Sequence, residues 1–196
     1  MADQFPTDFL NRDSGDRRAF FRTTVGRVMS EIGRHAEKRV VQKRYMRPPG
    51  ALDEIAFLAA CTRCGDCFPV CPVQAIVKVP TVGGLAAGTP MIDAKLQPCI
   101  VCDDMPCAQA CPTAALIVPE AGWSGYHMAS LELISERCIA FDGTECGVCA
   151  DACPVGTEAL ALDDGGRPVI RPEGCVGCGL CVRACVTTPS SLALHY

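Results

Sequence analysis

The sequence predicts an α+β fold in which one small unit is repeated four times. All sixteen cysteines of the 196-residue chain fall into four groups at similar intervals. A short apolar run follows each group, and turn-forming Gly and Asp residues separate these runs. The groups are Cys61, Cys64, Cys67 and Cys71; Cys99, Cys102, Cys107 and Cys111; Cys138, Cys146, Cys149 and Cys153; and Cys175, Cys178, Cys181 and Cys185.

Each repeat is expected to run from a strand through a cysteine loop and one or two helical turns to a second strand. Apolar residues dominate the strands expected after the four groups, at residues 75–79, 115–118, 159–162 and 192–194. The strands expected before the later groups lie at residues 90–95, 131–135 and 168–171. Proline follows the last cysteine in three groups, and Val186 takes its place in the fourth.

The first fifty residues have a different pattern. Apolar residues between positions 21 and 40 recur at steps of three or four, which is typical of an amphipathic helix. Residues 1–50 carry eleven Lys and Arg against six acidic residues, so their charge is +5, whereas residues 51–196 carry −9 of the total of −4. We therefore predict a basic amphipathic helical arm over residues 1–50 and a cysteine-bearing body over residues 51–196. The arm is expected to dock on a partner or on another copy of the chain, with packing on the body or an anionic membrane face as alternatives.

The spacing of the cysteines matches the ligands of [4Fe-4S] clusters. A cube needs one thiolate per iron, and a C-x2-C-x2-C loop brings three sulfur atoms to one cube. In the bacterial arrangement, the cysteine before proline ligates the other cluster of a pair. The sixteen thiolates therefore supply four cubes with none left over. All sixteen cysteines are the predicted cofactor-binding residues and the predicted ligands of the iron.

Zinc and disulfide bonds are the alternatives for a cysteine-rich chain. Zinc ribbons use two C-x2-C pairs, not three cysteines with a fourth before proline. Disulfide bonds require an oxidising compartment. The twin arginines Arg17 and Arg18 resemble an export motif, but charged residues occupy positions 23–44, where an apolar segment should follow. We therefore predict a cytoplasmic protein whose thiols are reduced or metal-bound.

Three functional classes are considered: an electron-transfer subunit, an iron–sulfur enzyme with an open iron site, and a zinc-stabilised interaction module. The sequence has no phosphate-binding glycine loop, no catalytic triad pattern and no apolar run of about 18 residues that could span a membrane. The acidic body argues against nucleic acid as a partner. His35, His127 and His195 lack ligand spacing, and Trp123 is expected to fill a gap between strands. Because thiolates can ligate every iron, we predict a non-catalytic electron-transfer subunit.

Several segments resemble the four-cluster ferredoxins of the NapG and MauM type. They are RPPGA at residues 47–51, CTRCGDC at 61–67, GTP at 88–90, CIVCDDMPC at 99–107, and the stretched third group with seven residues between Cys138 and Cys146. The resemblance runs from about residue 47 to residue 194. It implies tandem bacterial-type ferredoxin domains, each with two [4Fe-4S] clusters and pseudo-twofold symmetry.

The resemblance also implies an oxidoreductase as the partner. NapG and MauM proteins serve periplasmic nitrate reductase and methylamine-utilisation systems, and other relatives are iron–sulfur subunits of molybdenum and tungsten oxidoreductases. Because no apolar export segment follows the twin arginines, we expect a cytoplasmic molybdenum- or tungsten-pterin enzyme, such as an aldehyde oxidoreductase. A quinol-linked nitrate reductase or a methylamine-type system is the alternative.

In related four-cluster subunits the first cysteine group pairs with the fourth and the second with the third. This nested pairing implies one ferredoxin-like unit from residues 61–71 and 175–185 and another from residues 99–111 and 138–153. Its ligand sets are Cys61, Cys64, Cys67 and Cys185; Cys71, Cys175, Cys178 and Cys181; Cys99, Cys102, Cys107 and Cys153; and Cys111, Cys138, Cys146 and Cys149. The intervals in this sequence also permit sequential pairing.

Overall fold

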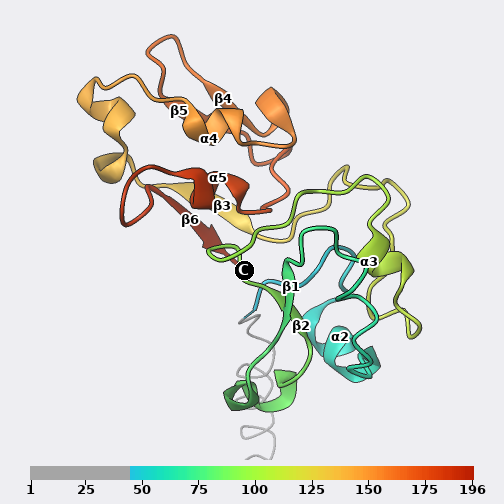
Figure 1. The fold of residues 1–196 in the computed structure, drawn as a ribbon. Helices are drawn as coiled ribbons and strands as arrows, with labels where there is room; N and C mark the ends of the chain where they lie inside the picture. The colour runs from blue at the N-terminus through green and yellow to red at the C-terminus, as the bar shows by residue number, and fades with distance from the viewer. Residues whose placement is uncertain (1–44) are drawn as a thin grey trace, which may run out of the picture. The chain divides into compact units, whose positions relative to one another are not determined.

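The computed structural model describes residues 45–196, in which short strands pair in antiparallel couples (Figure 1). The pairs are β1 (Ile76–Lys78) with β2 (Pro90–Ile92), β3 (Ser130–Leu133) with β6 (Leu192–His195), and β4 (Leu160–Leu162) with β5 (Pro168–Ile170). An isolated antiparallel bridge joins Ala51 to Leu116. The mixture of strands and short helices confirms the α+β fold class.

The strand pairing divides the body into two repeats of one plan. In the N-terminal repeat, residues 45–118, the β1–β2 hairpin lies between the two partners of the Ala51–Leu116 bridge along the chain. In the C-terminal repeat, residues 128–196, the β4–β5 hairpin lies in the same way between β3 and β6. Six of the seven expected strands are confirmed. The exception is residues 115–118, where the bridge at Leu116 is the single strand-like contact.

Short helices occupy the loops. The α-helices are α2 (Glu54–Ala60), α3 (Pro106–Gln109), α4 (Val148–Asp151) and α5 (Leu180–Ala184), and the 3-10 helices are η1 (Thr81–Ala86), η2 (Ser135–Arg137), η3 (Ile139–Asp142) and η4 (Gly156–Glu158). Helix α2 was not expected from the sequence. It begins where the Asp53 carboxylate accepts a hydrogen bond from the Ala56 N–H at 3.2 Å. It buries Phe57 completely and ends at Cys61.

Residues 46–50, which the sequence analysis assigned to the arm, belong to the body. All five are buried. The Met46 carbonyl accepts a hydrogen bond from Ile92 N–H at 2.8 Å, and the Gly50 carbonyl accepts one from Ile117 N–H at 2.7 Å. A Cβ atom on Gly50 would lie 2.2 Å from the Ile117 carbonyl oxygen, so this position requires glycine. The remainder of the predicted arm, residues 1–44, lies outside the described residues.

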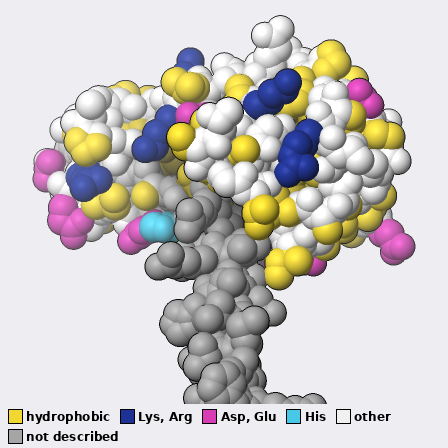
Figure 2. All heavy atoms as spheres, turned by 90° about the horizontal axis from the view of Figure 1, so that it is seen from below, with side chains coloured by type: hydrophobic (Ala, Val, Ile, Leu, Met, Phe, Trp, Pro, Cys, Tyr) yellow, Lys and Arg dark blue, Asp and Glu magenta, His cyan; other side chains and the backbone are white. Residues whose placement is uncertain are grey.

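One core runs through both repeats. Few of its members are large: Phe57, Met46, Met105 and Met128 are the bulkiest apolar side chains, and cysteines fill much of the rest. The same cluster of buried residues includes Val176 and Cys178 of the C-terminal repeat. Many apolar side chains also lie at the surface, where Figure 2 shows them scattered among basic and acidic side chains.

Arg47 ties the beginning of the body to α2 and β2. Its guanidinium is 1% exposed and forms an ion pair with Glu54 at 2.6 Å. It also donates hydrogen bonds to the Thr89 hydroxyl and the Pro90 carbonyl, both at 2.8 Å. The guanidinium carbon lies 4.6 Å from the centre of the Phe57 ring. All polar contacts of this buried charge are thus made within the body.

Replacing Arg47 with methionine is expected to destabilise the body by about 3–5 kcal/mol, because Glu54 would remain buried without a partner. The midpoint of urea unfolding under anaerobic conditions measures the loss. The same replacement at exposed Arg137 is the control, with an expected change within about 0.5 kcal/mol. Equal stability of the two variants would contradict the role of Arg47.

Candidate cluster-binding sites

Twelve of the sixteen cysteines line three cavities, four to each cavity. Site I contains Cys61, Cys64, Cys67 and Cys111; site II contains Cys71, Cys99, Cys102 and Cys107; and site III contains Cys153, Cys175, Cys178 and Cys181. The equal number of thiols indicates that each site suits the same group.

Site I lies at the end of α2. The helix brings Cys61 to the cavity, and the following loop carries Cys64 and Cys67. Arg63, within this loop, donates hydrogen bonds from its guanidinium to the carbonyls of Leu85 at 2.8 Å and Ala87 at 2.9 Å. The loop of site I is therefore fastened to the segment around η1.

Site II has the most apolar walls. Ile76 of β1, Ile92 of β2 and Met105 line it together with Trp123. The indole N–H of Trp123 donates a hydrogen bond to the Cys102 carbonyl at 2.8 Å. Trp123 thus fills space as expected and also fixes the loop that carries a site II cysteine.

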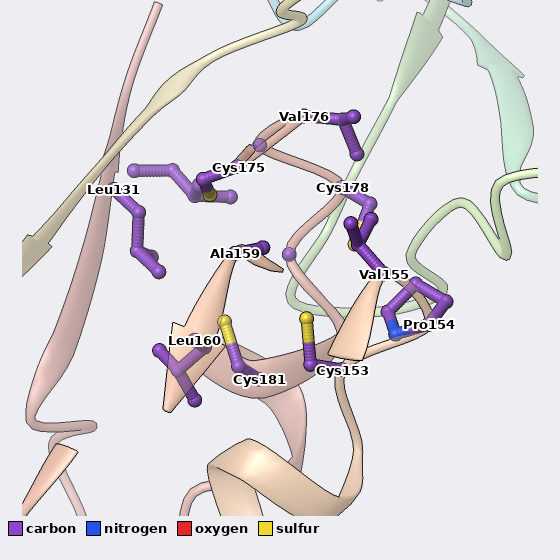
Figure 3. Close-up of a pocket in the computed structure, with 13 residues that line it drawn as sticks. Leu131, Cys153, Pro154, Val155, Ala159, Leu160, Cys175, Val176, Cys178 and Cys181 are labelled. Carbon is purple, nitrogen blue, oxygen red and sulfur yellow. The ribbon is translucent and has the colours of Figure 1, made fainter. Parts of the chain in front are cut away.

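Site III is built by the C-terminal repeat. Figure 3 shows the sulfur atoms of Cys153 and Cys181 pointing the same way, into the space that Ala159, Cys175 and Cys178 surround. Leu160 of β4 and Leu194 of β6 contribute to the apolar lining. The loop and both strand pairs of this repeat therefore meet at one thiol site.

The remaining four cysteines belong to the third and fourth groups. Cys138, Cys146 and Cys149 lie near one another: burial raises the pKa of Cys149, and negative charge on Cys138 and Cys146 raises it further. We call this set, with Cys185, site IV. Burial alone would raise the pKa of Cys185, but hydrogen bonds from Ser191, Thr187 and Ser190 lower it to about 6. Hydrogen-bond donors therefore surround the Cys185 sulfur.

The nested pairing of the cysteine groups is wrong. Cys71 lies in the cavity of Cys99, Cys102 and Cys107, not with the fourth group, and Cys153 lies with the fourth group, not the second. The physical reason is the β1–β2 hairpin, which joins the first group to the second, as the β4–β5 hairpin joins the third group to the fourth. Each repeat therefore pairs its own two groups in sequence.

One backbone feature recurs in three of the cysteine loops. Arg63, Val101 and Gly177 each stand two residues after the first cysteine, and their φ angles are 62°, 61° and 70°. A left-handed conformation costs about 1–2 kcal/mol for a residue other than glycine. The chain accepts this strain twice, at Arg63 and Val101, where the loop must curl around a site.

The buried thiols fit a positively charged metal cluster. Burial raises the pKa of Cys67, Cys99 and Cys181 to about 12 and that of Cys107 and Cys178 to about 11. At neutral pH these thiols on their own would be protonated, whereas a cluster iron supplies the charge that stabilises thiolates. Four thiols per cavity with apolar walls are the donor set of an iron–sulfur cube.

The four sites follow one another in order. Negative charge on Cys107 of site II raises the pKa of Cys67 of site I. In the same way, Cys178 of site III acts on Cys99 of site II. Cys149 of site IV acts on Cys181 of site III. Each site therefore has a cysteine whose charge affects a cysteine of the next site, in the order I, II, III, IV.

Among the residues that the structure describes, no histidine lines the cavities of sites I, II and III. His127 Nδ1 is 2.8 Å from the Cys175 carbonyl oxygen, and the exposed His195 Nε2 lies 2.6 Å from Glu132 Oε2. His35 lies outside the described residues. Sequence analysis missed the roles of Arg63 and Ser191, because their contacts depend on loop conformation. Between residues 45 and 196, no helix has the length and apolarity needed to cross a membrane.

The 4Fe-4S dicluster domain family matches this chain twice, at residues 60–115 and 137–188. The first match contains the first two cysteine groups, and the second contains the last two. These boundaries agree with sequential pairing. Two dicluster domains give the chain four [4Fe-4S] clusters.

Curated relatives share the region that contains these domains. The ferredoxin-type protein NapG of Escherichia coli is 38% identical over 152 residues, which are 72% of this chain and 66% of that protein. The methylamine utilization ferredoxin-type protein MauM of Paracoccus denitrificans is 38% identical over 154 residues, which are 74% of this chain and 69% of that protein. The ferredoxin-type protein NapF of Escherichia coli is 31% identical over 145 residues. This chain therefore belongs to the NapG and MauM family of [4Fe-4S] ferredoxin-type proteins.

Proposed function

We propose that this chain relays single electrons through its four [4Fe-4S] clusters to or from a catalytic oxidoreductase. The observation that carries this proposal is the succession of thiol sites, in which each site has a cysteine close to the next. The clusters supply reversible one-electron chemistry when bound. The residues of this chain hold the clusters at fixed separations and surround them with apolar side chains, which keep water away.

All sixteen cysteines are the proposed iron ligands. Sites I, II and III each combine three cysteines of one group with the last cysteine of the paired group. The same rule assigns Cys185 to site IV, because it is the last cysteine of the paired group and belongs to none of the other three sites. The proposed ligand sets are Cys61, Cys64, Cys67 and Cys111; Cys71, Cys99, Cys102 and Cys107; Cys153, Cys175, Cys178 and Cys181; and Cys138, Cys146, Cys149 and Cys185. This exchange of one ligand gives each repeat a pseudo-twofold relation between its loops.

The proposed role is non-catalytic. With four thiolates on each cube, no iron has an open position for substrate. The chain would therefore serve as the electron-transfer subunit of a complex, and the chemistry on substrate would belong to its partner.

The relatives support the alternative partner better than the aldehyde oxidoreductase. The names of the MauM proteins refer to methylamine utilization, whereas none of the relatives named above has an aldehyde oxidoreductase in its name. We propose an accessory role with a nitrate reductase or a methylamine-type system. The cytoplasmic location and the docking role of the arm remain predictions, since both depend on residues 1–44.

Protein purified without oxygen should contain about sixteen iron and about sixteen sulfide per chain, because each cube holds four of each. Iron and acid-labile sulfide analysis measures both quantities. Stoichiometric zinc with little sulfide would contradict the proposal.

Two double variants test the ligand sets. The variant Cys71→Ala/Cys102→Ala removes two ligands of one site, so it should lose one cluster and keep about twelve iron. The variant Cys71→Ala/Cys178→Ala removes ligands of two sites and should keep about eight iron. Nested pairing makes the opposite prediction, because it assigns Cys71 and Cys178 to the same cube.

Removal of residues 1–44 tests docking by the arm. A variant that begins at Tyr45 keeps the buried residues Met46 and Arg47 and should retain its full iron content. It should no longer copurify with its oxidoreductase, because the basic segment that steers association is absent. An intact complex would exclude the arm as the attachment site.

A further inference from the structure

The loop that follows Cys185 surrounds the sulfur atom with hydrogen-bond donors. Thr187 Oγ1 and Ser191 Oγ each lie 3.2 Å from the sulfur, and the Ser191 N–H donates to it at 3.4 Å. A ligating thiolate carries no proton, so both hydroxyls must donate. Ser191 is 4% exposed. Ser191 is thus held beside the sulfur within the body, where water competes little for its hydrogen bond, and Thr187 is half-buried.

The equivalent cysteines of the N-terminal repeat have fewer donors. Cys71 accepts a hydrogen bond from Ala75 N–H at 3.2 Å. Cys111 accepts one from Leu116 N–H at 3.4 Å and has Thr113 Oγ1 at 3.8 Å. Among residues 45–196, Thr113 supplies the only hydroxyl bond to either of these sulfur atoms. Two close hydroxyls are therefore particular to Cys185.

Hydrogen bonds to a cluster sulfur change the reduction potential. Reduction adds one negative charge, which spreads over the sulfur atoms, and donors stabilise the reduced cluster more than the oxidised one. More and shorter hydrogen bonds therefore raise the potential of a cluster relative to its neighbours. Removing a donor should lower it.

Charged side chains near the sites also change the reduction potentials of the clusters, but less directly. Asp142 and Glu145, within the stretched third group, are exposed, so solvent and salt screen their charges. Arg63 at site I is also exposed, and its guanidinium bonds to the carbonyls of Leu85 and Ala87. The hydroxyls at Cys185 contact the sulfur itself, so we expect them to have the larger effect on the reduction potential.

We propose that Thr187 and Ser191 make the cluster at site IV the highest-potential cluster of this chain, so that electrons entering the relay collect at site IV. This inference rests on the proposed function and on Cys185 as a ligand of site IV. The electron that site III loses is the electron that site IV gains, so one cluster is oxidised as the other is reduced. Site IV is then the end of the relay from which electrons leave for an acceptor, and site I is the entry.

A potentiometric titration followed by electron paramagnetic resonance tests the proposal on the full chain. In Thr187→Val and in Ser191→Ala, the component that is reduced first should shift to lower potential, and the other three should stay in place. A tenfold shift in its equilibrium corresponds to about 59 mV for one electron. Thr187→Ser keeps a hydroxyl, so its first component should titrate at the same potential as in the unaltered chain.

Two further variants serve as comparisons. Ser130→Ala makes the same chemical change at a hydroxyl that bonds to the His195 carbonyl, and it should shift no component. Thr113→Val removes the longer bond to Cys111 and should shift a different component by less. A shift of a lower-potential component in the Thr187 and Ser191 variants, or no shift, would overturn the proposal.

Iron content separates this inference from the proposed function. If all variants hold about sixteen iron and four components titrate, electron relay stands whatever the order of potentials. If the unaltered chain lacks four redox-active clusters, the proposed function itself fails.

Discussion

The rest of this structure depends on one arrangement. Three cysteines of one loop meet the last cysteine of the paired loop. Neither loop of a repeat can complete its thiol site alone, so the two must face each other. The β1–β2 and β4–β5 hairpins supply that arrangement, because each joins the loops of its own repeat. Aromatic residues are scarce, and the thiol sites with their short apolar walls take the central place in the core.

The same constraint shapes the backbone. Gln74, Ala114 and Gly156 each stand three residues after the last cysteine of a group, and all three have positive φ angles. The fourth group, which lacks the proline, departs from this pattern and places Thr187 and Ser191 beside its sulfur instead. A change of one residue type after the cysteine thus accompanies a different environment for the sulfur atom of Cys185.

Much of this architecture could be predicted from the sequence, because strand pattern and cysteine spacing are local properties. Six strands and the grouping of the cysteines were predicted correctly. The pairing of the groups could not be derived, since the intervals allow both arrangements and only the hairpins decide between them. The burial of Arg47 depends on Glu54, Thr89 and Pro90, which are separated from it in the sequence. The hydroxyls around Cys185 likewise depend on the course of a loop.

The close packing between the repeats has a consequence for the rate of electron movement. A Cβ atom on Gly179 of the C-terminal repeat would lie 2.5 Å from the Cβ of Ala94 of the N-terminal repeat. This contact lies beside Cys178 of site III, whose negative charge raises the pKa of Cys99 of site II. Tunnelling falls off steeply with distance, so a hinge at this point would interrupt conduction whenever it opened. The contact at Gly179 leaves no room for a side chain, so glycine at this position allows the two repeats to approach each other closely.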